Sequence, residues 1–174
     1  SMDQGIGKIL QSIESTGEGE NTQVWFISDN GGVASIPGNN DPLNGNKLTT
    51  FEGGVRVVAC VRWPAQWKGG RKIENTMGYI DVMPTVLTSA GINPTAGEIP
   101  GRQMDGVPLN ALLAGTRNDF PERDWYSYQG QNTIEDETIA IKTAKWKLIV
   151  MGPDIRRDGL TGAHEICLYK MPGD

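Results

Sequence analysis

The sequence predicts an α/β fold, with a mixed sheet flanked by helices, followed by a small antiparallel sheet near the C-terminal end. An amphipathic helical pattern leads into a short apolar strand, which is half of a βαβ unit. Two β-branched runs, Thr138–Lys142 and Trp146–Val150, flank a short turn and predict an antiparallel hairpin. The 174 residues are enough for one domain with a core.

The first residues predict a capped helix. Ser1 and Gln4 have the spacing of a capping box, and Gly17 is placed to end the helix in the left-handed conformation. Apolar residues recur between them at helical spacing and form one stripe. Its members are Met2, Ile6, Ile9, Leu10 and Ile13. Because this helix begins without any lead-in, we interpret the sequence as the C-terminal portion of a longer protein.

The next segment is an apolar run that stops abruptly at polar residues. Val24–Ile27 has the composition of a strand buried on both faces, and Gly31-Gly32 is expected to turn the backbone with positive φ. Ligands of open α/β sheets bind just beyond the carboxyl ends of strands. Asp29 and Asn30 lie there and carry the hard oxygen atoms that Ca²⁺ or Mg²⁺ takes. They are therefore candidate metal ligands, and an ordinary Asx turn is the alternative.

A long polar loop without periodicity follows, from Gly31 to Phe51. Loops of this length in a compact domain are usually functional or disordered. The loop carries one lysine, Lys47, and leads into a second apolar run. We interpret that run, Val55–Trp63, as a second buried strand that Pro64 closes.

Further helices and strands follow at intervals. Asp81 is placed to cap a helix that Gly91 ends, and Leu109–Leu113 predicts a short helix before Gly115. The polar segment 116–123 is the expected boundary between residues 1–118 and a small subdomain, 119–174. The predicted strands of that subdomain are Trp125–Tyr128, Thr138–Lys142, Trp146–Val150 and Ile166–Tyr169.

Composition excludes one class of partner and leaves the compartment open. The net charge is −5 and no lysine or arginine cluster occurs, so we expect no nucleic-acid partner. The apolar runs are too short for a membrane span, and the first residues do not form a signal peptide. The two cysteines, Cys60 and Cys167, lack metal-ligand spacing, and we expect buried free thiols.

Several short motifs follow one another in a specific order. They are Ser28-Asp29-Asn30-Gly31-Gly32, Asn40-Asp41-Pro42-Leu43, Gly45-Asn46-Lys47, Phe51-Glu52-Gly53-Gly54-Val55-Arg56, Val61-Arg62-Trp63-Pro64, Tyr79-Ile80-Asp81-Val82-Met83-Pro84-Thr85 and Asp105-Gly106-Val107. This succession resembles the type I sulfatases, and within them most closely the arylsulfatase B-like branch. The resemblance covers most of the chain. It implies part of the alkaline-phosphatase-like sulfatase fold, with a small C-terminal antiparallel sheet.

The resemblance also implies a reaction, which is hydrolysis of the sulfuric ester of a small molecule or a sulfated carbohydrate. It makes Asp29 and Asn30 two ligands of a divalent metal, Ca²⁺ by family expectation and Mg²⁺ as the alternative. Lys47 would be a catalytic and substrate-binding residue that contacts the sulfate, whereas a solvated loop lysine is the plain alternative. Glu52 and Arg56 we interpret as a local ion pair that shapes the loop.

The nucleophile of the family is missing. Sulfatases take their nucleophile from a Cys-x-Pro-x-Arg or Ser-x-Pro-x-Arg segment, whose first residue is oxidised to formylglycine. Neither Cys60 nor Cys167 begins such a segment, and Ser35-Ile36-Pro37-Gly38-Asn39 ends in asparagine instead of arginine. His164, the one histidine, we interpret as a surface or hydrogen-bonded side chain. We therefore expect a sulfatase fragment that is inactive on its own.

Two other functions are considered. A phosphate or phosphonate ester hydrolase of the alkaline phosphatase superfamily would use a bound metal in the same way. The Lys47 loop and the Glu52–Arg56 motif argue against this function. A non-catalytic binding or assembly module would use exposed strand edges, which favour self-association. The family implies a periplasmic, secreted or lysosomal location, and the short apolar runs lead us to expect no membrane partner.

Overall fold

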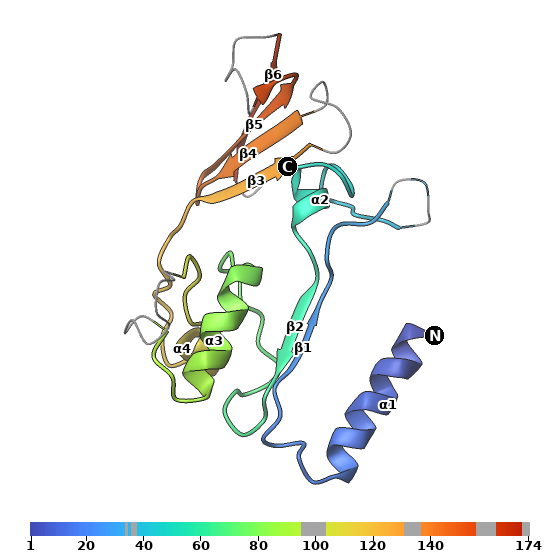
Figure 1. The fold of residues 1–174 in the computed structure, drawn as a ribbon, viewed down its shortest axis with the longest axis vertical. Coiled ribbons are helices and arrows are strands. Elements are labelled where there is room, and N and C mark those ends of the chain that lie inside the picture. The colour runs from blue at the N-terminus through green and yellow to red at the C-terminus, as the bar shows by residue number, and fades with distance from the viewer. Residues whose placement is uncertain (34, 36–37, 95–103, 131–136, 156–162, 172–174) are drawn as a thin grey trace. The chain divides into compact units, whose positions relative to one another are not determined.

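The computed structural model describes residues 1–33, 35, 38–94, 104–130, 137–155 and 163–171 (Figure 1). The chain forms two compact units that interleave along the sequence. The first combines Ser1–Trp25 with Val61–Phe120, and the second combines Phe26–Cys60 with Pro121–Asp174. The division into residues 1–118 and 119–174 stays a prediction.

The first unit begins with helix α1, Met2–Ser15. The predicted capping box is confirmed, because Ser1 Oγ accepts a hydrogen bond from Gln4 N and Gln4 Oε1 accepts one from the N-terminal amine. Gly17 follows with φ +78°. None of the helix residues is fully buried; of the apolar stripe, Met2 and Ile9 are exposed and the other three residues are half-buried.

Two shorter helices complete the first unit. The 3₁₀ turn η1, Tyr79–Asp81, leads into α3, Val82–Ser89, and Gly91 follows with φ +79°. Helix α4, Asn110–Ala114, ends at Gly115 with φ +73°. Both predicted helices and their glycine stops are confirmed. Glycine is favoured at these two stops because other residues pay a steric cost at positive φ.

The predicted capping role of Asp81 is wrong. No side chain caps α3; instead Asp81, which is fully buried, accepts from Gly78 N at 3.0 Å and from Val107 N at 2.9 Å. Thr85, also fully buried, accepts from Leu109 N at 2.9 Å. The Asp81 carboxylate thus holds Val107 and the Thr85 hydroxyl holds Leu109, since buried backbone N–H groups need partners.

Tryptophan and leucine side chains form the core of the first unit. Trp67, Leu109 and Leu113 are buried in one cluster. Trp25 and Trp63 meet the Trp67 ring edge-on, at centroid distances of 6.0 and 5.3 Å. Such edge-to-face pairs add about 0.5–1.5 kcal/mol each to the area they bury.

Strand β1, Val24–Ile27, pairs with β2, Ala59–Arg62, in a two-stranded sheet of the described chain (Figure 1). The expectation that both strands are buried is wrong, because Phe26, Ala59 and Cys60 are exposed. A two-stranded ribbon covers little of its own surface. Cys60 and Cys167 are free thiols as predicted, but Cys60 is exposed and Cys167 half-buried.

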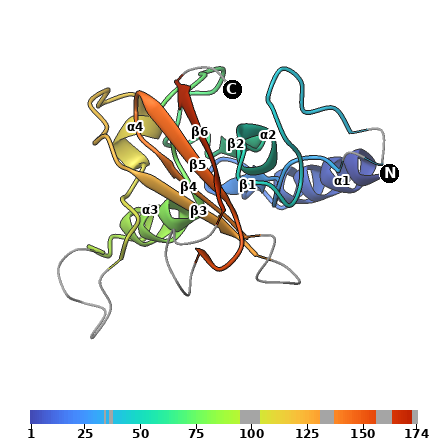
Figure 2. The same cartoon turned by 90° about the horizontal axis from the view of Figure 1, so that it is seen from above.

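The second unit holds a four-stranded antiparallel sheet of the described residues, in the order β3-β4-β5-β6 (Figures 1 and 2). Its strands are β3 (Trp125–Gln129), β4 (Glu137–Lys142), β5 (Trp146–Gly152) and β6 (Glu165–Lys170). The predicted hairpin is confirmed: Lys142 lies opposite Lys147, and Ile139 lies opposite Val150. These pairs define two faces, since directly opposed residues share a face.

The two faces of this sheet differ in what covers them. One carries Tyr126, Ile166 and Leu168, which are 71%, 60% and 62% exposed. The other carries Lys147 and Ile149, which are both buried.

None of the helices in the described ranges has the length and apolarity that a bilayer crossing requires.

Candidate functional site

The polar turn after β1 is held by hydrogen bonds within a few residues. Ser28 N donates to Val58 O at 3.0 Å, and Ser28 Oγ donates to Asn30 O at 3.0 Å. Asn30 N donates to Asp29 Oδ1 at 3.0 Å. The Asp29 side chain is exposed and Asn30 is half-buried. The carboxylate and the amide therefore sit side by side on one short turn.

Each of these side chains keeps one oxygen available. Asn30 Nδ2 donates to Gly31 O at 2.9 Å, which sets the orientation of the amide. Within the described part of the chain, neither Asp29 Oδ2 nor Asn30 Oδ1 accepts a hydrogen bond. The turn thus combines local bonding, as an Asx turn does, with two hard oxygen atoms that a cation of the Ca²⁺ type prefers.

The long loop folds back on this turn. Lys47 N donates to Gly32 O at 2.9 Å, two residues after Asn30. Asn40 closes the loop, because its Oδ1 accepts from Gly32 N at 2.8 Å and its Nδ2 donates to Gly45 O at 3.2 Å. The side chain of Lys47 is exposed. The backbone of the one lysine in the loop thus lies against the turn that carries the candidate ligands.

Helix α2, Glu52–Val55, packs against both segments through its glycines. Gly31 N donates to Gly54 O at 2.9 Å, and Gly53 N donates to Asn44 O at 2.6 Å. A Cβ atom on Gly31 would lie 1.7 Å from Gly53 O, and one on Gly53 would lie 2.3 Å from Gly45 O. We call this contact of Gly31, Gly53 and Gly54 the glycine junction.

The junction corrects the predicted reason for glycine at position 31. Neither Gly31 nor Gly32 has positive φ. Gly31 is required because another backbone approaches closely, which is a second common use of glycine. Sequence alone does not distinguish the two uses, since the approaching backbone comes from residues more than twenty positions away.

Glu52 occupies a buried site between two lysines. Its carboxylate oxygens lie 2.7 Å from Lys147 Nζ and 2.5 Å from Lys142 Nζ. Glu52 and Lys147 are each 1% exposed. Burial of the Glu52 carboxyl raises its pKa, but hydrogen bonds and attraction from the two lysines outweigh burial and hold the pKa below 4.5.

This cluster corrects the interpretation of Glu52 and Arg56 as a pair that shapes a local turn. The carboxylate binds Lys142 and Lys147, 90 and 95 residues further along the chain. Arg56 is exposed, and its backbone N–H donates to Glu52 O at 2.7 Å. One signal in the sequence was available: Lys147 alternates with Trp146 and Leu148 in a predicted strand, so it must face one side of the sheet.

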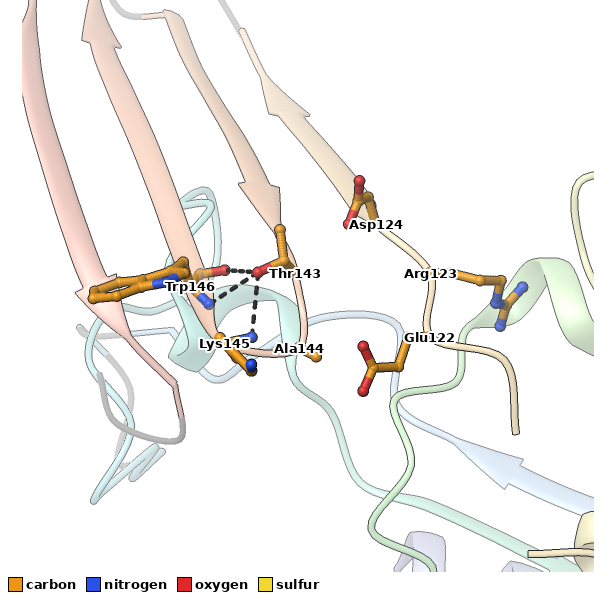
Figure 3. Close-up of a pocket in the computed structure, with 7 residues that line it drawn as sticks. All are labelled: Glu122, Arg123, Asp124, Thr143, Ala144, Lys145 and Trp146. Atoms are coloured by element: carbon orange, nitrogen blue, oxygen red, sulfur yellow. Dashed lines mark hydrogen bonds between the residues drawn. The ribbon is translucent and has the colours of Figure 1, made fainter. Parts of the chain in front are cut away.

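An open cavity of about 390 Å³ lies at the turn that joins β4 and β5 (Figure 3). It is lined by Glu122, Arg123, Asp124, Thr143, Ala144, Lys145 and Trp146. Thr143 Oγ1 accepts from Lys145 N and Trp146 N, at 3.2 and 2.9 Å, and shapes the turn. In Figure 3 the Arg123 side chain points away from the carboxyl groups, and its guanidinium lies 4.5 Å from the centre of the Trp125 ring. None of the predicted site residues lines this cavity.

The oxygen atoms of Asp29 and Asn30 are of the type that a hard cation binds, but they are too few to fill its coordination shell. Over the described ranges, no group of three or more His, Cys, Asp and Glu side chains could hold a metal ion. Ca²⁺ takes six to eight oxygen ligands, and Asp29 and Asn30 offer two of them.

Of the segment Ser35–Asn39, residues 36 and 37 lie outside the described residues. His164 is hydrogen-bonded as predicted, with Nε2 2.8 Å from Pro153 O.

Comparisons with known proteins agree with these motifs. The Sulfatase family model matches residues 1–92. Steryl-sulfatase of Mus musculus is 30% identical over 98% of this chain and 28% of its own length. N-acetylgalactosamine-6-sulfatase of Canis lupus familiaris is 37% identical over 84% of this chain and 27% of its own. Arylsulfatase D of Homo sapiens is 34% identical over 75% of this chain and 23% of its own.

Solved structures show the same fold. The crystal structure of Ps i-CgsB matches with a TM-score of 0.76 and 24% identity, over 96% of this chain and 34% of that one. Its complex with k-i-k-neocarrahexaose matches with a TM-score of 0.75. The predicted alkaline-phosphatase-like α/β fold with a small antiparallel sheet is confirmed, and the narrower likeness to arylsulfatase B stays a prediction. The chain spans about a quarter of the length of the relatives named above, and it belongs to the sulfatase family.

Proposed function

We propose that this chain is part of an enzyme that hydrolyses sulfuric esters, to which it contributes part of a metal site and a sulfate contact. The observation that carries the proposal is the hydrogen bond from Lys47 N to Gly32 O, 2.9 Å long. It joins the lysine loop to the turn of Asp29 and Asn30, so three candidate residues from two motifs belong to one small region. Sulfate ester hydrolysis needs positive charge around the sulfuryl oxygens, which a bound metal and the Lys47 ammonium would supply.

The roles follow from the available atoms. Asp29 Oδ2 and Asn30 Oδ1 would hold a divalent metal, with Ca²⁺ favoured and Mg²⁺ as the alternative. A bound metal supplies positive charge that stabilises the sulfuryl oxygens. The Lys47 ammonium adds a point charge and up to three hydrogen-bond donors for the same anion. Other ligands would come from residues outside this chain.

The nucleophile is also expected from outside this chain, as a formylglycine residue. Because the sequence contains no Cys-x-Pro-x-Arg or Ser-x-Pro-x-Arg segment, we expect the chain to be inactive alone. The names of the relatives indicate sterol and sugar sulfates as their substrates. We accordingly propose a sulfate ester small molecule or a sulfated carbohydrate as the substrate class here, and the periplasmic, secreted or lysosomal location stays a prediction.

Calcium titration by calorimetry tests the metal site directly. The chain should bind Ca²⁺, Asp29→Ala should abolish the binding, and Asn30→Ala should weaken it. Asp3→Ala, an exposed carboxylate on α1, is the matched control and should bind like the parent chain. Equal binding by the Asp29→Ala and Asp3→Ala variants would show that Asp29 is a turn residue only.

A second candidate function, self-association, is favoured by one observation. Tyr126, Ile166 and Leu168 lie on one face of the C-terminal sheet and are 60% or more exposed. Exposed apolar side chains gathered on one face are a feature of interaction sites. Light scattering across a concentration series tests this: a dimer that Leu168→Lys converts to monomer supports assembly, and a monomer at every concentration contradicts it.

A further inference from the structure

The Glu52 cluster is not used by the proposed chemistry, yet it contains two charged side chains that are each 1% exposed, Glu52 and Lys147. Lys142 and Lys147 lie opposite each other in the register of β4 and β5, so both ammonium groups face the same side of the sheet. One carboxylate therefore receives two charged donors from two strands. A carboxylate held by two separate donors cannot turn without breaking one of these bonds.

The residues next to Glu52 form the glycine junction. Gly53 N donates to Asn44 O in the lysine loop, and Gly54 O accepts from Gly31 N beside the candidate ligands. A ring contact adds to the fixation, because Phe51 meets Tyr169 of β6 at a centroid distance of 6.1 Å. Helix α2 is thus held by the sheet through Glu52 and holds both loops through the next two residues.

We propose that Glu52, Lys142 and Lys147 are positioning residues. They set the spacing between the turn that carries Asp29 and Asn30, called the ligand turn, and the loop that carries Lys47. They act on the site through α2 and touch neither metal nor sulfate. A helix of four residues is too short to be stable by itself, so its place depends on contacts such as these. The inference rests on the proposed function for what the site does, but its structural content is tested separately.

Amide hydrogen exchange measured by NMR on this chain provides the test. Three hydrogen-bonded amides report on the junction and the loop, namely Gly31, Lys47 and Gly53. Lys142→Met should make these amides exchange about tenfold faster or more, because a hydrogen bond to a charged group is lost and local opening becomes easier. Lys142→Arg should restore slow exchange. Lys170→Met, an exposed lysine of the same sheet, is the matched control and should change nothing.

Amides elsewhere separate positioning from general stability. Thr143 and Met171 report on the sheet, and Val107 and Leu109 report on the first unit. Faster exchange confined to the junction supports the proposal. Junction amides as slow as in the parent chain, or an equal acceleration of junction and sheet amides, overturn it. Lys142 is partly exposed, so its replacement is milder than that of fully buried Glu52.

Calcium titration of the same variants distinguishes the two proposals. Lys142→Met should weaken Ca²⁺ binding about tenfold although Asp29 and Asn30 are intact, since the ligand turn loses its fixed neighbour. If Asp29→Ala leaves Ca²⁺ binding unchanged, the proposed metal site fails while the exchange data still decide the positioning role. If Asp29→Ala abolishes binding and Lys142→Met leaves it unchanged, the positioning role fails alone.

Discussion

The ammonium group of Lys147 lies 2.7 Å from a carboxylate oxygen of Glu52, and each of the two side chains is 1% exposed. They are separated by 95 positions in the sequence. Buried ion pairs contribute little net stability when intact, but removing one partner leaves a charge without compensation. The pair therefore makes this region sensitive to single substitutions.

Lys147→Met should lower the free energy of unfolding by roughly 1.5–3 kcal/mol, because the buried Glu52 carboxylate would lose one of its two charged hydrogen-bond partners and keep Lys142. Urea denaturation followed by tryptophan fluorescence measures the change. Glu74→Gln, which removes an exposed partner of Lys72, is the control and should stay within about 0.5 kcal/mol. Equal effects of the two substitutions would contradict a buried pair.

Stability should depend on acid pH through Glu52. Its pKa in the folded chain lies below the ordinary value of 4.5, so the folded state favours the ionised carboxylate. This contribution is fully present above pH 4.5 and is lost as the pH falls from 4.5 through the lowered pKa. Glu52→Gln should remove it and flatten the acid limb of a stability curve recorded in urea. An unchanged acid limb would show that other carboxyl groups cause it.

Gly31→Ala should destabilise the second unit by about 1–3 kcal/mol, as overpacking does. The added Cβ would meet Gly53 O at 1.7 Å, and backbone atoms cannot rotate away. Gly5→Ala is the matched control, since nothing lies within 4 Å of its Cβ position in α1. That substitution should stabilise by about 0.5–1 kcal/mol. Thermal unfolding of the two variants in opposite directions confirms the junction.

In the proposed enzyme, Lys47→Ala should lower kcat/KM for an aryl sulfate by about 100-fold, as the loss of one charge-stabilising donor does. Lys47→Arg should recover part of the loss because it keeps the charge. Lys8→Ala on α1 is the control for general effects. Activity that is the same in the Lys47→Ala and Lys8→Ala variants would make Lys47 a solvated loop residue.

Asp81→Ala should destabilise the first unit by about 1–3 kcal/mol, because the half-buried amides of Gly78 and Val107 would both lose their carboxylate partner. Asp105→Ala, which removes an exposed carboxylate nearby, should change stability by less than about 0.5 kcal/mol. Chemical denaturation of both variants provides the comparison. A small effect of Asp81→Ala would indicate that water replaces the carboxylate.

Elements with local signals were predictable from the sequence. The capping box of Ser1 and Gln4 defines the start of α1, and Gly115 defines the end of α4, since each acts on residues within one turn. The hairpin of β4 and β5 was predictable because β-branched runs flank a short turn. The role of Asp29 and Asn30 as metal ligands stays a prediction.

Features that depend on distant partners were not predictable. Glu52 was placed in a local pair because its true partners, Lys142 and Lys147, lie in another part of the sequence. Burial of β1 was overestimated, because composition shows that a strand can be buried and not whether other elements cover it. The role of Gly31 was misread for the same reason, since only three-dimensional packing brings Gly53 beside it.

The near-complete burial of Lys147 has a practical consequence. An amine-reactive reagent cannot reach its ammonium group while β5 stays packed on α2, whereas Lys72, with 84% of its side chain exposed, is modified at once. The ratio of the two labelling rates, read by mass spectrometry after proteolysis, therefore times how often this interface separates. Labelling of Lys147 thus reports the rate at which β5 and α2 separate, without an introduced probe.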